Sequence, residues 1–422
     1  MKTLNIGLVG FGTVGSSVKN TIDKRKEEIK KQHNFEFNIK RIAVKRKDAE
    51  RKISVPAELL SSVDDIIQNP EIDTVIELIG GKDPAKDIIT RALRNKKNVI
   101  TANKELLADY GDALISEARK NGCYFGFRAA MTGCYEVLDR LYYGGTVQSV
   151  IGVFNGTCNY ILTEMERTNK DFGQILKQAQ DLGYAEKDPS LDIDGIDTKY
   201  KLMAIARLVL AASLRSKNFY VEGIRGMDPQ DSQFAKRLGY KIKLLGKIVR
   251  EGEEVDIRIH PALIPQEKIL ASLRGVENCI QINDSLKGQG SLVAAGAGGN
   301  PAAMAIFSDL IDTAREAKIH WPTVNKKISV KRINSIRCKY YMRFNAINQP
   351  GVLAKVASAL ARFDININKV IQEGEKIGAV VPIIIITAEA LEGNVKKALR
   401  IIDSLPVIKE KTRLIRIEEN VS

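Results

Sequence analysis

The sequence predicts an α/β protein built from three parts. Three observations predict this class. A β-prone run at the N-terminus breaks at closely spaced glycines and continues as a helix, strand-like and helical stretches are mixed through the middle, and the C-terminal region follows a βαββαβ order. A length of 422 residues fits two or three domains, and an apolar fraction of 44% is ordinary for a globular chain.

The first predicted element is a strand over Thr3–Val9. It ends at Gly10-Phe11-Gly12-Thr13-Val14-Gly15, and helix-like sequence follows from Ser16. Strand, glycines and helix in this order are the context in which a G-x-G-x-x-G motif binds a dinucleotide. Gly10 permits the tight turn, Gly12 lets the backbone approach a pyrophosphate, and Gly15 lets helix and strand pack closely. We therefore predict a Rossmann-type, doubly wound nucleotide domain. A glycine turn without a nucleotide is the alternative.

The second strand, predicted over Glu36–Val44, indicates which dinucleotide binds. It is followed by Lys45-Arg46-Lys47, and the first acid comes only at Asp48. An NAD site usually places an acid at this strand end to bond the ribose 2′-OH, whereas positive charge accommodates a 2′-phosphate. Lys45 and Arg46 therefore favour NADP, with NAD still possible and a solvated basic loop as the alternative.

Two later strand ends carry further candidate residues. The run Ile72–Gly81 predicts a buried parallel strand ending in Gly80 and Gly81, and a short strand over Asn98–Ile100 precedes Thr101-Ala102-Asn103-Lys104. Open parallel sheets bind ligands at the carboxyl ends of their strands. Gly80, Thr101 and Lys104 are therefore candidate ligand contacts. Lys104 could orient a substrate carboxylate or take part in proton transfer.

The segment Gly183–Lys201 carries five acids and three lysines and leads into the apolar run Leu202–Ala212. So much charge before a buried helix predicts a polar site mounted on a core element. Asp197 and Lys201 are four residues apart, so they share one face of that helix. The alternative is an exposed ion pair, which would be common and weak.

Five motifs together resemble homoserine dehydrogenase, in that family's order, over about residues 3 to 320. They are Glu77–Gly81, Thr101–Lys104, Phe154–Leu162, Gly183–Lys201, and Gly296–Pro301 with Ser308–Leu310. The resemblance implies the NAD(P)-dependent interconversion of L-homoserine and L-aspartate 4-semialdehyde, in the biosynthesis of threonine, methionine and isoleucine.

The resemblance also implies a role for each position. Lys201 would be the acid/base group, and Lys104 would assist it or bind substrate. Glu186 would take the substrate ammonium, and Asp192 would sit beside the reacting hydroxyl and the lysines, together with Asp197. A lysine partly desolvated among carboxylates can be tuned for proton transfer.

The segment Phe127–Glu136 departs from the family pattern. Arg128 replaces a glutamate, and Thr132 and Cys134 replace glycines. In the family, carbonyls of this loop can hold a sodium ion and the loop flanks the nicotinamide. The added side chains crowd a loop that needed glycine. The candidate sodium ligands are the carbonyls of Arg128, Met131, Gly133 and Tyr135, and further cofactor contacts are implied at Gly183 and Gly298.

The middle region is predicted to be an α+β substrate and dimerisation domain over residues 136–294. The nucleotide domain would comprise residues 1–135 plus 295–325, and a regulatory domain would follow over 338–422. Predicted strands are Ser149–Asn155, Lys243–Arg250 and Glu254–His260; predicted helices are Asn159–Thr168, Phe172–Leu182 and Thr198–Leu214. By resemblance we expect a homo-oligomer, a dimer or tetramer.

The C-terminal region alternates strands and helices in the order βαββαβ. Its predicted elements are strands from Lys339, over Ile365–Val370, Val380–Thr387 and Arg413–Ile417, and helices over Val352–Phe363 and Asn394–Leu405. With the turn at Pro350-Gly351, this order resembles the ferredoxin-like ACT domain, an amino-acid-sensing module. The implied effector is L-threonine, near Asn348, Gly351, Val352 and Asn366. A ligand-free oligomerisation module is the alternative.

Composition excludes several other classes. The net charge of +14 comes from lysine-rich runs without interleaved aromatics, which argues against nucleic-acid binding. The three histidines have no metal-ligand spacing, and five scattered cysteines suit a reducing cytoplasm. No apolar stretch approaches the roughly 18 residues of a membrane span.

Two function classes stay open. The first is an NADP-linked homoserine dehydrogenase that is feedback-regulated through an ACT domain. The second is an NADP- and amino-acid-binding regulatory paralogue with low turnover. Within enzymes, an NADP-dependent dehydrogenase of another amino acid is the alternative. Lys201 and its neighbouring acids favour the enzyme, because a sensor needs no proton-transfer group.

Overall fold

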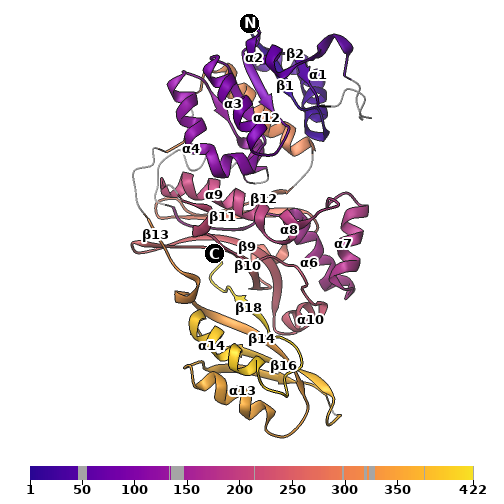
Figure 1. Ribbon diagram of the computed structural model, residues 1–422, viewed down its shortest axis with the longest axis vertical. Coiled ribbons are helices and arrows are strands. Elements are labelled where there is room, and N and C mark those ends of the chain that lie inside the picture. The colour runs from indigo at the N-terminus through magenta and orange to yellow at the C-terminus, as the bar shows by residue number, and fades with distance from the viewer. Residues whose placement is uncertain are drawn as a thin grey trace. The chain divides into compact units, whose positions relative to one another are not determined.

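The computed structural model describes residues 1–45, 55–132, 134, 147–212, 214–296, 299–317, 321–322, 328–374 and 376–421. The chain forms two compact units, each discontinuous in sequence. Unit 1 comprises residues 1–145, 197–216 and 292–327, and unit 2 comprises residues 146–196, 217–291 and 328–422. Figure 1 labels their helices and strands. The domain boundaries predicted from the sequence stay predictions.

Unit 1 is built on a parallel sheet with the strand order β3-β2-β1-β4-β5-β6 among the described residues. This is the order of a doubly wound dinucleotide-binding sheet, so the predicted Rossmann-type fold is confirmed. The strands are β1 (Lys2–Val9), β2 (Phe35–Ala43), β3 (Leu60–Ser61), β4 (Thr74–Glu77), β5 (Asn98–Thr101) and β6 (Phe125–Gly126).

Helices cover this sheet because their apolar faces match its buried side chains. The helices of unit 1 are α1 (Thr13–His33), α2 (Val63–Gln68), α3 (Asp83–Arg94), α4 (Lys104–Lys120), α9 (Ile196–Leu210) and α12 (Gly299–Ala314), with 3₁₀ turns η1 (Ala57–Leu59) and η2 (Arg128–Met131). Helices α1 and α12 pack together, and Val18, Ile22 and Phe307 join the strand residues Ile6 and Leu8 in one core.

Unit 2 contains a larger sheet that runs without a break into the C-terminal region. Its order is β12-β11-β7-β9-β10-β18-β14-β16-β15, with β8 and β13 on β10 and β17 on β14. The strands are β7 (Val147–Val153), β8 (Tyr220–Val221), β9 (Tyr240–Glu251), β10 (Glu254–Pro265), β11 (Glu277–Asp284), β12 (Gly288–Ala295), β13 (Ser329–Val330), β14 (Arg337–Ile347), β15 (Ile367–Gln372), β16 (Val380–Thr387), β17 (Ala390–Leu391) and β18 (Arg413–Ile417).

The join is a short parallel pairing of β10 with β18, in which Ala262 lies opposite Arg416 and Leu263 opposite Ile417. The other long pairings of this sheet are antiparallel, as in the β9–β10 hairpin. The C-terminal region is therefore hydrogen-bonded to the middle region through its last strand.

The helices of unit 2 divide between these two regions. They are α6 (Gly156–Thr168), α7 (Phe172–Asp181), α8 (Ser190–Ile193), α10 (Pro229–Arg237), α11 (Ile269–Ser272), α13 (Val352–Ala361) and α14 (Glu392–Asp403), with 3₁₀ turns η3 (Ser216–Asn218) and η4 (Ile333–Ser335). Figure 1 shows α13 and α14 beside the sheet of β14 and β16, and Val356 and Leu399 pack there on Tyr340 and Ile385. The predicted βαββαβ module is confirmed.

Some elements of the structure were not predicted from the sequence. Strand β12 is rich in glycine and alanine, which favour strands weakly. Helix α10 is mostly polar, but Asp228 caps it and Pro229 begins it, a start signal that the sequence does contain. Across the described residues, no helix combines the length and the apolar character needed to cross a bilayer. The five cysteines are free and buried.

Candidate active site

The glycine motif forms the turn that its pattern predicts. Gly10 has φ +100°, and a Cβ there would lie 2.7 Å from the Leu78 carbonyl oxygen. A Cβ on Gly15 would lie 2.7 Å from the Gly10 carbonyl oxygen. The helix can therefore approach the turn this closely only because residue 15 is glycine. By contrast, the position of a Cβ on Gly12 faces open space. The backbone above Gly12 is therefore accessible to a ligand.

The N-terminus of α1 is suited to an anion. Gly12 provides no side-chain cap, and the first turn, which begins at Thr13, contains no acidic residue. The free N–H groups and the helix dipole at such an end favour a phosphate. Phe11 is buried and Val14 is half-buried, so within the motif they also serve the core. The residues present fit the pyrophosphate of a dinucleotide.

The residues predicted to select the 2′-phosphate lie just beyond β2. Lys45 is exposed at the end of the described part of this strand connection, whereas Arg46 lies outside the described residues. Gly298, predicted to contact the cofactor, also lies outside them. Gly183 lies in unit 2 with φ +75°.

A buried hydrogen-bond network shapes the loops after β4 and β5. The Glu77 carboxylate accepts hydrogen bonds from the Ile79 and Gly80 backbone N–H groups, at 2.8 and 3.3 Å, and from the Thr101 hydroxyl at 2.6 Å. Burial raises the pKa of Glu77, and these hydrogen bonds oppose the shift. The Asn103 side chain caps α4 at the Leu106 N–H. The predicted contacts Gly80, Thr101 and Lys104 thus follow two rigid, neighbouring strand ends.

Two lysines of unit 1 share one buried carboxylate. Lys104, the first residue of α4, forms an ion pair with Asp197, and the Lys201 Nζ lies 3.4 Å from the other oxygen of that carboxylate. Asp197 is 3% exposed and Lys201 5% exposed. The prediction that Asp197 and Lys201 share a helix face is confirmed. The alternative of an exposed ion pair is wrong, because α9 buries this face.

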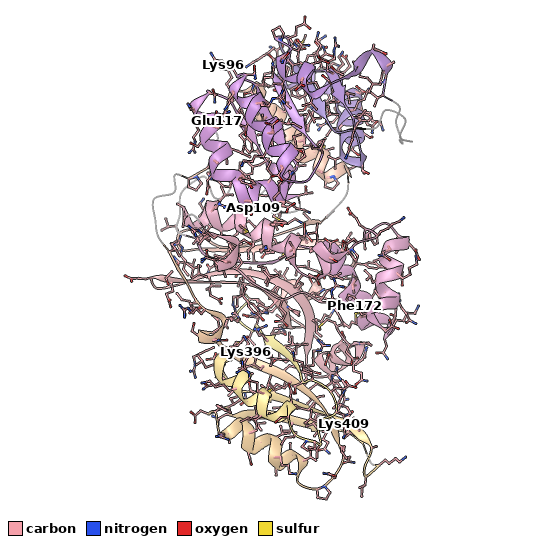
Figure 2. All side chains as sticks on the ribbon, in the orientation of Figure 1. Lys96, Asp109, Glu117, Phe172, Lys396 and Lys409 are labelled. Atoms are coloured by element: carbon pink, nitrogen blue, oxygen red, sulfur yellow. The ribbon has the colours of Figure 1, made fainter. Side chains whose placement is uncertain are left out.

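Further contacts hold α9 against α4 around this cluster. The Tyr200 hydroxyl donates to Glu105 at 3.1 Å, and the Arg207 Nε lies 3.3 Å from Asp112. Lys82 also pairs with Glu105, at 3.0 Å, and with Asp109, which Figure 2 labels, at 2.7 Å. The lysine–aspartate geometry is therefore set by two helices that are fastened along several turns.

In unit 2, a second set of predicted residues surrounds the start of α6. The Asn155 side chain donates to the Asp192 carboxylate at 2.7 Å, while its oxygen caps α6 at the Cys158 N–H. The Cys158 thiol lies 3.2 Å from the Asp192 carbonyl oxygen. Asn155 belonged to a family motif but was not among the predicted site residues; its position directly before a helix was the available signal.

The other acids of Gly183–Lys201 have distinct surroundings. Glu186 is exposed, and the backbone there is held through a hydrogen bond from Gln180 to the Glu186 carbonyl at 3.0 Å. Asp194 accepts two hydrogen bonds from Arg225, each 2.8 Å long. Asp188 accepts from the Ser190 N–H at 3.1 Å. Asp188 and Asp194 of this charged segment thus have partners within unit 2.

Arg128, the most conspicuous departure from the family pattern, is fully accommodated. Its guanidinium lies 2.7 Å from both Asp309 and Asp312 on α12, and its backbone N–H donates to Asp309 at 3.0 Å. Asp309 is 1% exposed, and a Cβ on Gly126 would collide with its carboxyl. The arginine thus fastens η2 to α12 instead of disrupting the turn.

The predicted sodium ligands are only partly described. Gly133 and Tyr135 lie outside the described residues, and the Met131 carbonyl accepts a hydrogen bond from the Cys134 N–H at 2.9 Å. Arg128 and Met131 alone provide no oxygen cage for a cation. Among the described residues, no group of three or more His, Cys, Asp or Glu side chains is placed to hold a metal ion.

Comparison with known proteins bears directly on this site. The family model for homoserine dehydrogenase matches residues 134–311, its NAD-binding domain matches residues 10–128, and the ACT domain matches residues 340–406. The chain belongs to the homoserine dehydrogenase family. Homoserine dehydrogenase of Neisseria gonorrhoeae is 33% identical over 99% of both chains, and that of Bacillus subtilis is 32% identical over 100% of this chain and 99% of its own.

Comparison with solved structures supports the same family. A homoserine dehydrogenase from Thiobacillus denitrificans superimposes with a TM-score of 0.92, at 34% identity over 99% of each chain. Family membership makes this chain an NAD(P)-binding oxidoreductase of amino-acid biosynthesis with a C-terminal ACT domain. The alternatives of a low-turnover regulatory paralogue and of a dehydrogenase for another amino acid are not favoured by these matches.

Proposed function

We propose that the chain interconverts L-homoserine and L-aspartate 4-semialdehyde, with Lys201 as the group that moves the hydroxyl proton. One observation carries this assignment. Asp197 binds both Lys104 and Lys201 inside unit 1, and Lys201 is almost completely buried. A buried lysine with a fixed carboxylate partner is held in place for proton transfer and shielded from bulk water.

The redox chemistry divides between cofactor and protein. The nicotinamide, when bound, exchanges a hydride with the carbon that carries the substrate hydroxyl. In the oxidation, the hydroxyl proton passes to the Lys201 amine; in the reduction, the Lys201 ammonium returns it. The Asp197 carboxylate holds both lysines through ion pairs, so the Lys201 amine has a fixed position for this transfer. Lys104 orients the substrate or assists this transfer.

Glu186 and Asp192 are the proposed substrate ligands of unit 2. Glu186 is exposed and carries a carboxylate suited to an ammonium group. The Asn155 side-chain amide donates to the Asp192 carboxylate at 2.7 Å, which fixes the orientation of that carboxylate. We assign the substrate ammonium to Glu186 and hydroxyl contact to Asp192.

A spectrophotometric assay tests the acid/base assignment. Purified protein is mixed with L-homoserine and NADP or NAD, and the reduced nicotinamide is followed by absorbance. Lys201→Ala should lower kcat by about a hundredfold or more. Lys199→Ala is the matched control, because Lys199 lies on the same helix and its amine donates a hydrogen bond to Ser216 at 3.0 Å. Equal activity of Lys201→Ala and Lys199→Ala would show the assignment to be wrong.

We also propose NADP as the preferred cofactor. Lys45 and Arg46 stand where an NAD site usually has an acid. Arg46→Asp should lower kcat/KM for NADP at least tenfold relative to NAD, since it replaces attraction to the 2′-phosphate with repulsion. An unchanged ratio of the two kcat/KM values would refute the preference.

For regulation, we propose that the ACT domain binds L-threonine near the turn before α13. Gly351 has φ +85° and begins this helix without a side-chain cap, which leaves its N–H groups open to a carboxylate. Asn348 donates to the Gly374 carbonyl at 3.1 Å, so it shapes the facing loop. Isothermal titration of the full chain with L-threonine should show saturable binding, and its absence would remove the sensing proposal.

Two wider properties complete the proposal. We expect a homodimer or homotetramer, which light scattering of the purified chain would detect. We also expect a cytoplasmic location, since all five cysteines are free and buried and none forms a disulfide with another.

A further inference from the structure

We propose that a second ligand site lies in unit 2, in a cavity of about 490 Å³ between α14, β18 and β8, and that it binds a small molecule carrying a phosphate group. The cavity is separate from the turn before α13 and from the residues assigned to substrate and nucleotide. Figure 2 labels one of its cations, Lys396, which projects from α14.

The charge of the lining identifies the ligand class. Five cationic side chains and two carboxylates line the cavity, so positive charge is in excess. The cations are Lys396, Arg400, Lys411, Arg413 and Arg416. They come from a helix, a loop and a strand, so their convergence is a property of the fold and not of one charged run. A concave surface lined mainly by one sign of charge concentrates ligands of the other sign.

The buried Arg416 guanidinium, paired with two carboxylates, forms the floor of the cavity. Arg416 is 2% exposed and donates from Nε to Glu392 and from Nη1 to Glu222, each at 2.7 Å. Burial opposes ionisation of Glu392, yet hydrogen bonding to Arg416 holds its pKa below the usual range. The centroid of the Tyr220 ring lies 5.0 Å from the Arg416 guanidinium carbon and 5.6 Å from the Lys396 Nζ. These groups form a scaffold whose charges are already balanced.

The cations that remain for a ligand are Arg400 and Lys411. Both are exposed, and neither forms an ion pair or side-chain hydrogen bond within the described part of the chain. A guanidinium fork beside a lysine point charge is the combination that recognises phosphate oxygens. The cavity is larger than a phosphate ion, and Glu222 and Asp403 on its walls can accept hydrogen bonds from hydroxyl or ammonium groups of the ligand. A phosphate ester of a small polar molecule fits these features.

One residue of the cavity wall, Glu222, directly precedes backbone that contacts the proposed substrate segment. Directly after Glu222, a Cβ on Gly223 would lie 2.1 Å from the Ile193 carbonyl oxygen, and the Ile224 N–H donates to that oxygen at 2.7 Å. Ile193 follows Asp192 in the chain. A ligand that shifts the backbone at Glu222 would therefore also shift the backbone next to Asp192. This coupling rests on the proposed role of Asp192, whereas the binding site itself does not.

Titration calorimetry of the full-length protein tests the site. The probes are O-phospho-L-serine and inorganic phosphate, each added at ionic strength matched with potassium chloride. We expect saturable binding, weakened about tenfold or more in the double variant Arg400→Ala/Lys411→Ala. Binding of inorganic phosphate as tight as that of the ester would assign the site to free phosphate, and tighter ester binding would assign it to an organic phosphate.

Lys397→Ala is the matched control, because Lys397 is exposed on α14 but does not line the cavity. Its affinity for the probes should equal that of the unmodified chain. The proposal is overturned if neither probe binds saturably, or if Lys397→Ala weakens binding as much as the double variant. Circular dichroism of each variant checks folding, and Lys411→Glu provides a second exposed substitution that should weaken binding further.

The coupling has a separate readout. Saturating O-phospho-L-serine should shift the KM for L-homoserine in the unmodified chain but not in the double variant. An unchanged KM despite calorimetric binding would refute the coupling but would not affect the proposal of the phosphate site. Failure of the proposed function would instead appear as absent turnover without any added phosphate.

Discussion

Asp231→Ala should weaken the packing of the ACT region on the middle region and lower the free energy of unfolding. Asp231, on α10, is completely buried and accepts hydrogen bonds from the Tyr341 hydroxyl at 2.9 Å and from Arg343 at 2.6 and 3.1 Å. The variant leaves the Arg343 guanidinium, 5% exposed, with its partner Asp228 and leaves Tyr341 without an acceptor. Removing one partner of a buried ion pair costs about 3–5 kcal/mol of unfolding free energy.

Asp228→Ala is the matched control for this variant. Asp228 contacts the same arginine at 2.7 Å, but its side chain is 31% exposed, and it also caps α10. Losing a cap and a partly exposed ion pair should cost about 1–2 kcal/mol. Urea unfolding of the full chain, followed by circular dichroism, gives both values, and hydrogen exchange of α10 and β14 locates the loss. If Asp231→Ala proved no more destabilising than Asp228→Ala, the burial argument would be refuted.

Three further predictions concern the other parts of the fold. Burial lowers the pKa of Lys243 from 10.5 to about 8. Between these pH values Lys243 is protonated in the unfolded chain but loses its proton in the folded chain, so its contribution to the free energy of unfolding increases as pH rises. The free energy of unfolding of the unmodified chain, minus that of Lys243→Met, should therefore increase by about 3 kcal/mol from pH 8 to pH 10.5. If urea unfolding gave the same difference at both pH values, the pKa shift would be contradicted. Gly10→Ala, at φ +100°, should weaken NADP binding at least tenfold in a fluorescence titration, and unchanged affinity would exclude a strained turn at the cofactor. Asn155→Ala should raise the KM for L-homoserine severalfold and cost about 1 kcal/mol of helix capping, so an unchanged KM would separate Asn155 from substrate binding.

Local patterns predicted most elements well. Strands β16 and β18 have the bounds predicted for them, and α7 differs by one residue at its end. These segments alternate or repeat their apolar residues with a clear period, and the period is set by the geometry of the element itself. Elements without such a period, above all β12 and α10, were missed.

The candidate site shows the same division. The shared helix face of Asp197 and Lys201 follows from their spacing alone, since residues four apart meet on any helix. That the face is buried does not follow, because burial depends on what packs against α9. The contact of Lys104 with Asp197 joins segments far apart in the sequence, and no local pattern contains it.

The sequence by itself determined the family, the order of elements and the chemical types of the site residues, because motifs and periodicities are local. It also determined the glycine turn, since only glycine fits the close approach at Gly10 and Gly15. Tertiary structure decided which carboxylate each lysine meets, how Arg128 is neutralised by Asp309, and that β18 extends the sheet of β10. These contacts depend on long-range packing. The partner of a strand edge or of a buried charge is set by which segments the complete fold brings together, and not by the residues next to it in the chain.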